Sequence, residues 1–212
     1  MIRVVTAAAA VTGRPPSPDR PPDAAHPDEL DELTRVRAAR GDPSACRALV
    51  LRYQTPVFAV LTRLLGPRRR GLVEDFAQET FLRTFRALPG FDGAGTARLS
   101  SWILTIATRL ALDELRRRRA DTEPLGDDEE ASPGGGDRPD ETAARHDLGR
   151  AIDRALGALG ADARAVLVLR ELHDLEYAEI ADALQVDLGT VKSRLSRART
   201  ALRMALAEVC DE

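Results

Sequence analysis

The stretch YAEIADALQVDLGTVKSRLSRARTALR, residues 177–203, decides the fold of the last part of this chain. Apolar side chains recur at helical spacing on both sides of the central QVD, which predicts helices at 177–184 and 188–203 joined by a tight turn. Ala181 is small where the two helices would cross closely. The other apolar residues that would fill the wedge and continue the inward stripe are Ile180, Leu184, Val186, Val191, Leu195, Ala198 and Leu202. This is the pattern of a helix-turn-helix.

The second of these helices has a cationic outer face. From Leu188 to Ala207 there are five basic residues and no acidic one. Such a helix fits the DNA major groove with its N-terminal half against base edges, where Arg and Lys suit guanine and Ser or Thr suit several edges. The turn carries Gln185, which must adopt a left-handed conformation at a cost of about 1 kcal/mol. We predict DNA contacts from Thr190, Lys192, Ser193, Ser196, Arg197 and Arg199.

Composition and charge divide the rest of the chain. With 43% hydrophobic and 4% aromatic residues, the core must be mainly Leu, Ala, Val and Ile, which favours helices. Residues 1–27 hold six of the 13 prolines and no helical stripe, so a disordered extension is expected. Residues 28–119 carry 17 basic and 11 acidic side chains (net +6), whereas 120–147 carry 2 and 10 (net −8) and 148–212 carry 9 and 11 (net −2).

These divisions predict an all-α protein with two small helical domains, 28–119 and 148–212, of which the second contains the helix-turn-helix. The acidic residues 120–147 have no apolar stripe, so we expect a flexible linker between the domains. A solvated spacer and a functional segment are both open interpretations of this linker.

The segment LVEDFAQETFLRTFRAL, residues 72–88, has the spacing of a half-buried helix. Its apolar stripe is Val73, Ala77, Phe81, Phe85 and Leu88. Another face of the same helix groups Asp75, Gln78, Glu79 and Leu82. That face is either an ordinary solvated surface or a docking surface for a basic partner.

The segment RLSSWILTIATRLALDELRRRR, residues 98–119, follows a glycine-rich stretch and predicts an amphipathic helix with Ser100 or Ser101 as its N-cap. The expected outer face holds Arg98, Thr105, Thr108, Arg109 and the terminal arginines. Four consecutive arginines repel one another, and phosphate is their natural counter-charge. Trp102, the single Trp, is either a core residue or a surface on which a base stacks.

Other residue patterns exclude several classes of protein. Cys46 and Cys210 are far apart, and no HExxH or CxxC motif is present, so we expect neither a disulfide framework nor a metal site or cofactor. No nucleophile–base pair or phosphate-binding glycine loop is apparent, and we expect no catalytic residues and no enzymatic activity. The apolar start of residues 1–13 is too weak for a membrane span or secretory signal, so a cytoplasmic protein without membrane insertion is expected.

Three motifs, in this order, resemble one family. EDFAQETFLRTF, SSWILTIATRLALDELRRRR and YAEIADALQVDLGTVKSRLSRAR together resemble bacterial RNA polymerase sigma factors of the extracytoplasmic-function group, in the sigma-70 family. The resemblance covers about 28–119 (the family's region 2) and 148–207 (region 4). It implies a protein that binds core RNA polymerase and directs promoter-specific transcription initiation, with core polymerase, promoter DNA and an anti-sigma factor as partners.

The resemblance also implies roles for the candidate residues. Asp75, Gln78, Glu79 and Leu82 would dock on the polymerase clamp helices. The loop 91–98 and the helix after it would open the promoter −10 element and read its non-template strand, through Arg98, Trp102, Thr105, Arg109, Arg116 and Arg117. The helix at 188–203 would read the −35 element as duplex, and the linker would run through the polymerase cleft.

Chain length adds a constraint. A flexible 28-residue linker has a root-mean-square span of roughly 30 Å and a maximum reach of about 95 Å, while sites a couple of DNA turns apart are about 70 Å away. A rigid third body must therefore set the spacing, and polymerase fits that role. Two rival hypotheses are a stand-alone regulator that dimerises through 28–119 and a helical adaptor that binds acidic proteins.

Overall fold

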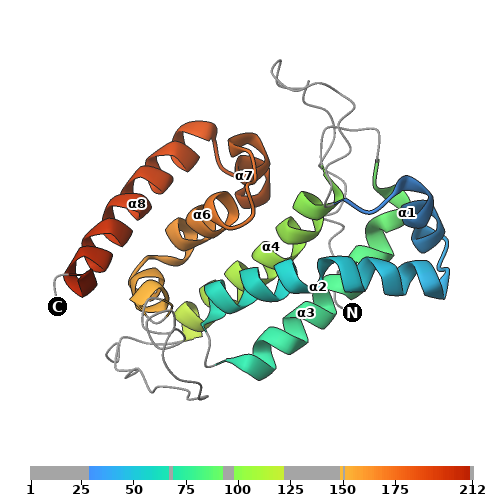
Figure 1. The fold of residues 1–212 in the computed structure, drawn as a ribbon, viewed down its shortest axis with the longest axis horizontal. Helices are drawn as coiled ribbons and strands as arrows, with labels where there is room; N and C mark the ends of the chain where they lie inside the picture. The colour runs from blue at the N-terminus through green and yellow to red at the C-terminus, as the bar shows by residue number, and fades with distance from the viewer. Residues whose placement is uncertain (1–28, 67–68, 93–97, 122–148, 150, 211–212) are drawn as a thin grey trace.

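The computed structural model describes residues 29–66, 69–92, 98–121, 149 and 151–210. Within these ranges all regular structure is helical, as the composition predicts. The helices form two groups that lie side by side: α1 to α4, and the segment from 151 onward with α6, α7 and α8 (Figure 1). The proline-rich residues 1–27 and all but the first two residues of the acidic stretch 120–147 lie outside the described ranges.

The first group begins with two helices that have side-chain N-caps. In α1 (Glu32–Ala39) the Asp31 carboxylate accepts from the Thr34 amide at 2.9 Å, and in α2 (Pro43–Leu65) Asp42 does the same for the Ala45 amide at 2.9 Å. Each cap satisfies one of the amide groups that a helix leaves unpaired at its start. The pKa of Asp42 is lowered, first by the hydrogen bond from Ser44 and then by that amide.

The next two helices complete the bundle. α3 (Arg70–Ala87) ends in the short 3₁₀ turn η1 (Leu88–Gly90), and α4 (Leu99–Asp121) follows. The predicted apolar stripe of α3 faces inward, because Val73, Ala77, Phe81 and Leu88 are buried and Phe85 packs partly against the core. The helix α2 contributes five fully buried side chains to the core, Leu49, Val57, Val60, Leu61 and Leu64.

The second group contains the predicted helix-turn-helix. A helical segment at 151–157 precedes α6 (Ala161–Glu171), α7 (Tyr177–Leu184) and α8 (Leu188–Cys210). The wedge between α7 and α8 is filled as the spacing predicts, with Ile180, Ala181, Leu184, Val191, Leu195 and Ala198 all buried. Gln185 has φ 55°, so the turn takes the left-handed conformation that the sequence implies.

The two groups share one hydrophobic core. Side chains of α2 and α4 from the first group and of α6 and α7 from the second pack as one continuous cluster. The helix α4 lies between the other helices of the first group and the helices α6 and α7 of the second (Figure 1). The two helical units are thus packed face to face in this structure, in addition to being joined through the chain.

This central position of α4 corrects two expectations. Thr108 was placed on an outer face, but it is fully buried, because α4 contacts helices on both sides. Ser100 or Ser101 was expected to cap α4, but the helix starts at Leu99 and Ser101 is buried inside it. The carboxylate of Glu29 supplies the cap, since it accepts from the Ser100 amide at 3.3 Å.

The turn at Gln185 yields a prediction about stability. Glycine adopts positive φ without the steric cost that a side chain carries, so Gln185→Gly should raise the free energy of unfolding by about 0.5–1 kcal/mol. Gln185→Val should lower it, because a β-branched residue is worst at this position. Urea denaturation of the three proteins measures both changes. A glycine variant that is less stable than the valine variant would contradict this account of the turn.

Candidate nucleic-acid interface

The outer face of α8 is open to solvent along its first four turns. Lys192, Ser193, Ser196 and Arg197 are exposed, while Leu195 and Ala198 face the core. Thr190 is held at the start of the helix, where the Asp187 carboxylate accepts from its amide and its hydroxyl, both at 2.7 Å. These two hydrogen bonds lower the pKa of Asp187 and keep the cap charged. The helix therefore presents a fixed cationic surface.

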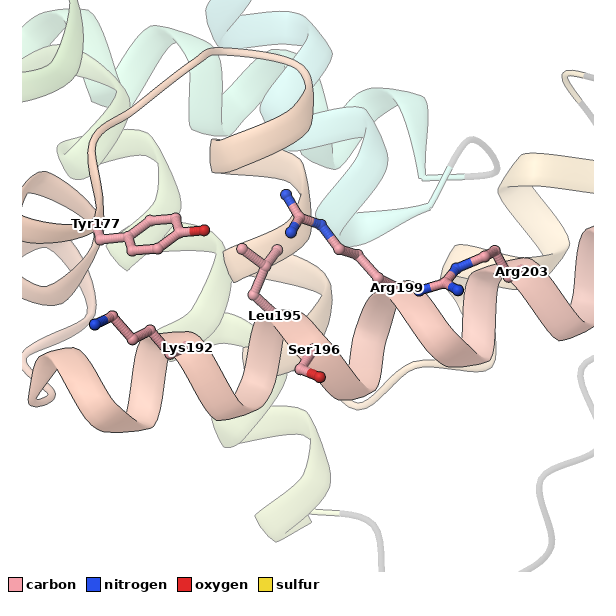
Figure 2. Close-up of a pocket in the computed structure, with 6 residues that line it drawn as sticks. All are labelled: Tyr177, Lys192, Leu195, Ser196, Arg199 and Arg203. Atoms are coloured by element: carbon pink, nitrogen blue, oxygen red, sulfur yellow. The ribbon is translucent and has the colours of Figure 1, made fainter.

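A shallow hollow of about 190 Å³ lies on the flank of this surface. Figure 2 shows the ring of Tyr177 above Lys192, with Leu195 between that ring and Arg199. Arg199 also donates to Glu171 of α6 at 2.6 and 2.9 Å, and this hydrogen-bonded carboxylate raises the pKa of the guanidinium. Ser196 and Arg203 complete the lining. Cationic and hydroxyl groups around a concave surface are suited to a phosphate group.

The predicted docking residues share one exposed face of α3. Asp75, Gln78 and Leu82 are exposed, and Leu82 is 41% accessible although it is apolar. Glu79 is half-buried and accepts from Arg83 at 2.7 Å, one turn further along the helix. The structure thus brings the four residues together on one face of α3, with the apolar Leu82 at the C-terminal end of the group.

The basic residues of α4 have a different environment from the one predicted. Arg98 donates to Glu179 of α7 at 3.1 and 3.5 Å and to the Asp174 carbonyl at 3.3 Å. Its side chain is only 16% exposed. Arg109 donates through Nε to the Ala183 carbonyl at 2.9 Å and through Nη2 to the Asp182 carbonyl at 2.7 Å.

The contact of Arg109 has a direct physical cause. The last carbonyl groups of a helix have no partner within the helix and carry the negative end of its dipole. Asp182 and Ala183 belong to the last turn of α7, so a guanidinium from α4 satisfies them. Arg109 is therefore bound between the two helical groups in this structure.

Three of the four terminal arginines of α4 are paired with acidic residues of this chain but remain largely exposed. Arg116 lies 3.4 Å from both Asp113 and Asp162, and its side chain is 61% exposed. Arg117 and Arg118 donate to Glu114 at 2.9 and 2.6 Å, and these bonds lower the pKa of that carboxylate. This cluster explains how neighbouring arginines are tolerated without a bound phosphate.

Thr105 and Trp102 are the remaining predicted residues of α4. Both are half-buried. The Thr105 hydroxyl donates to the Ser101 carbonyl at 2.8 Å, and the Trp102 ring lies 5.0 Å from the ring of Phe91 at 42°. Trp102 is therefore packed on one side against the core and accessible on the other.

Further ionic contacts join the two groups. Arg63 of α2 forms an ion pair with Asp153, and Arg164 of α6 donates to the Leu64 carbonyl at 2.9 Å. Sequence reasoning missed these residues, as well as Glu179 and Glu29. The one available signal was the acidic pair Glu179 and Asp182 in the helix at 177–184, and helical spacing does not identify Arg98 as a partner.

Within the described ranges, no three His, Cys, Asp or Glu side chains are grouped as metal ligands, and every helix is too short or too polar to span a bilayer.

Comparison with known proteins identifies this architecture. Residues 49–120 match the family model "Sigma-70 region 2", and residues 149–202 match "Sigma-70, region 4". RNA polymerase sigma-H factor of Pseudomonas aeruginosa is 31% identical over 87% of this chain and 97% of its own length. ECF RNA polymerase sigma factor SigE of Mycolicibacterium smegmatis is 35% identical over 90% of this chain and 74% of its own.

A solved structure has the same arrangement of helices. The structure of CnrH in complex with the cytosolic domain of CnrY matches with a TM-score of 0.60 and 26% identity, and covers 84% of this chain and 97% of CnrH. The chain belongs to the sigma-70 family of RNA polymerase sigma factors. Within that family it is a factor of the extracytoplasmic-function group, and it directs promoter-specific transcription initiation with RNA polymerase.

The contact of Arg109 gives a prediction about the arrangement of the two groups. Loss of a charged hydrogen-bond donor costs about 1.5–3 kcal/mol, so Arg109→Ala should increase the ratio of separated to packed molecules about tenfold or more. The separation is measured by energy transfer between two dyes, attached to cysteines introduced at Thr55 of α2 and Thr200 of α8. The native Cys46 and Cys210 are replaced by Ser in this protein. Arg86→Ala, an exposed arginine of α3, is the matched control. Equal transfer in the Arg109 variant and the control would show that this contact does not hold the groups together.

Proposed function

We propose that the two helical groups divide the work of promoter recognition. Residues 28–119 dock on core polymerase and read the −10 element as single strand, and residues 148–212 read the −35 element as duplex. The observation that carries the proposal is the exposed cationic face of α8 within a formed helix-turn-helix. Such a face fits the major groove with its N-terminal half against base edges.

The −35 contacts are assigned to the first turns of α8. Lys192 and Arg197 carry the charge and donor geometry that suit guanine, and Ser193 and Ser196 suit several base edges. Arg199 and the hollow beside Tyr177 suit the phosphate backbone, which positions the helix. The amide and hydroxyl of Thr190 both donate to Asp187, so the role of Thr190 is to order the start of the helix next to DNA.

The docking contacts are assigned to α3. Asp75, Gln78 and Glu79 lie on the same face of α3 as the exposed Leu82, and a surface that combines polar groups with an apolar side chain is typical of a protein interface. The −10 contacts are assigned to Arg98, Trp102, Thr105, Arg109, Arg116 and Arg117. Of these, Arg116 and Arg117 are already exposed.

Reading the −10 element requires the two groups to separate. Arg98 and Arg109 donate to α7 in the packed arrangement, so the same donors reach DNA only after α7 moves away. The 26 residues 122–147 that follow α4 have a maximum reach of about 90 Å, which allows this movement. Core polymerase, by binding each group at its own place, would hold them apart.

The remaining roles follow from this one. An anti-sigma factor is a fitting partner, because CnrH, which is similar over most of its length, is solved in complex with a second protein, the cytosolic domain of CnrY. We assign the chain no catalytic residue and no cofactor, since bond formation belongs to polymerase. A factor that works on promoter DNA with polymerase acts in the bacterial cytoplasm.

The assignment of α8 is tested by Lys192→Ala. Loss of a base or phosphate contact should weaken binding of −35 duplex by about 1–3 kcal/mol. If the lost contact is to a phosphate, the slope of the logarithm of the binding constant against the logarithm of salt concentration should also fall by about one. Fluorescence anisotropy with a labelled duplex at several salt concentrations measures both quantities. Binding unchanged at every salt concentration would exclude Lys192 from the interface.

The assignment of α3 is tested by Asp75→Ala. This variant should bind core polymerase more weakly, while its binding of −35 duplex stays equal to that of the original protein, because α3 and α8 are on different helical groups. Core binding is measured by competition against the original protein for a limited amount of core enzyme. Loss of duplex binding with intact core binding would reverse the proposed division of labour.

A further inference from the structure

Two side chains near the start of the described chain contact residues on either side of the sequence 93–97, which precedes α4. Arg35 contacts Phe91 at one end, and Glu29 contacts Ser100 at the other. No sequence motif pointed to either residue. Their positions matter because the −10 contacts proposed above begin at Arg98, between these two anchors.

The Glu29 anchor is a helix cap supplied from outside the helix. Its two carboxylate oxygens each lie 3.3 Å from the Ser100 amide, and the Ser100 hydroxyl donates to the same carboxylate. A negative charge at this place satisfies an unpaired amide and is favoured by the dipole of α4. The start of α4 is therefore fixed to the segment that leads into α1.

Tyr53 holds the Glu29 carboxylate in place. The Tyr53 side chain comes from α2, is 3% exposed, and donates its hydroxyl to Glu29 at 3.1 Å. The same hydroxyl accepts from the Leu30 amide at 3.0 Å. Burial raises the pKa of Tyr53, so the hydroxyl keeps its proton and remains a donor. Three elements thus meet at one carboxylate.

The Arg35 anchor combines a hydrogen bond with a cation–π contact. Arg35 lies 5.6 Å above the ring centre of Phe91 and donates to the Phe91 carbonyl at 3.4 Å. The Arg35 guanidinium donates two hydrogen bonds to Glu32 from its other side, and these bonds orient the guanidinium and raise the pKa of Arg35. The Phe91 ring in turn packs on Trp102. A residue of α1 therefore orients the aromatic pair beside the proposed −10 surface.

We infer that Glu29 and Arg35 are positioning residues for −10 recognition, which act by holding Ser100 and Phe91 in register. This inference rests on the proposed function of α4. Recognition of bases needs groups held within roughly half an ångström, and side chains that support the contacting residues provide that accuracy. Loss of an anchor should reduce discrimination between bases at the −10 element more than it reduces binding to core polymerase.

The experiment uses holoenzyme reconstituted from the full chain and core polymerase. Transcripts from a random-sequence promoter library give the base preference at each position for the original protein and for Glu29→Ala, Glu29→Gln, Arg35→Ala and Arg35→Lys. We expect Glu29→Ala and Arg35→Ala to reduce preference at −10 positions about three- to tenfold, with −35 preference unchanged. Glu29→Gln keeps an acceptor for Ser100 and should restore part of the preference.

Matched controls separate positioning from stability. Arg37→Ala removes an ion pair to Asp42 in the same helix α1, and Glu74→Gln changes an exposed carboxylate paired with Arg70. Both should keep the original −10 preference. A uniform fall in transcription, with the preference profile intact in the Glu29 and Arg35 variants, would overturn the inference, because it indicates a purely structural role.

The outcome also distinguishes this inference from the function on which it rests. If the original protein showed no −10 preference, the proposed role of α4 would fail, and the positioning inference with it. If the original protein showed that preference and all four variants kept it, only the positioning inference would fail. Should Glu29→Ala not fold, Arg35→Ala tests the other anchor from a different element.

Discussion

The hydrogen bonds from Arg109 to the last carbonyl groups of α7 set the arrangement on which the rest of the structure depends. They place a charged side chain of α4 at the negative end of another helix, where the Asp182 carbonyl also accepts from the Gln185 amide. Because α4 also packs against α2, α3 and α6, it becomes the shared centre of both helical groups. The burial of Thr108 follows from that position, as does the small exposed fraction of the Arg98 side chain. A helix that looks amphipathic in sequence is in fact covered on more than one side.

The fold could be predicted from sequence wherever local periodicity determines it. The helices 177–184 and 188–203 were placed correctly at their starts, because Ile180, Val191 and Leu195 recur at the helical period around a short turn. The face of α3 with Asp75 and Leu82 was likewise placed at the surface. Contacts between distant segments could not be predicted in this way. The pairing of Arg98 with Glu179 joins residues 81 positions apart, and periodicity says nothing about which faces of two helices will meet.

Electrostatics explain why the basic residues of α4 can serve two arrangements. A guanidinium prefers a carboxylate, a carbonyl group or a phosphate oxygen, and the packed structure supplies the first two for Arg98 and Arg109. In the function proposed above, DNA would supply the third, together with the release of bound cations. The two arrangements therefore compete for the same donors. Added salt weakens the phosphate contacts strongly but screens the largely buried pair of Arg98 and Glu179 much less, so higher ionic strength shifts the balance toward the packed arrangement.

The two sets of contacts on α4 differ in what happens to them when the helical groups separate. Arg98 and Arg109 lose their partners on α7, since those partners belong to the other group. Glu29, Tyr53 and Arg35 belong to the same group as α4, so their contacts with Ser100 and Phe91 survive the separation. The start of α4 is thus held from two sides in the packed arrangement and from one side in the separated one. An arrangement of this kind frees the arginines for DNA while the helix that carries them keeps its orientation.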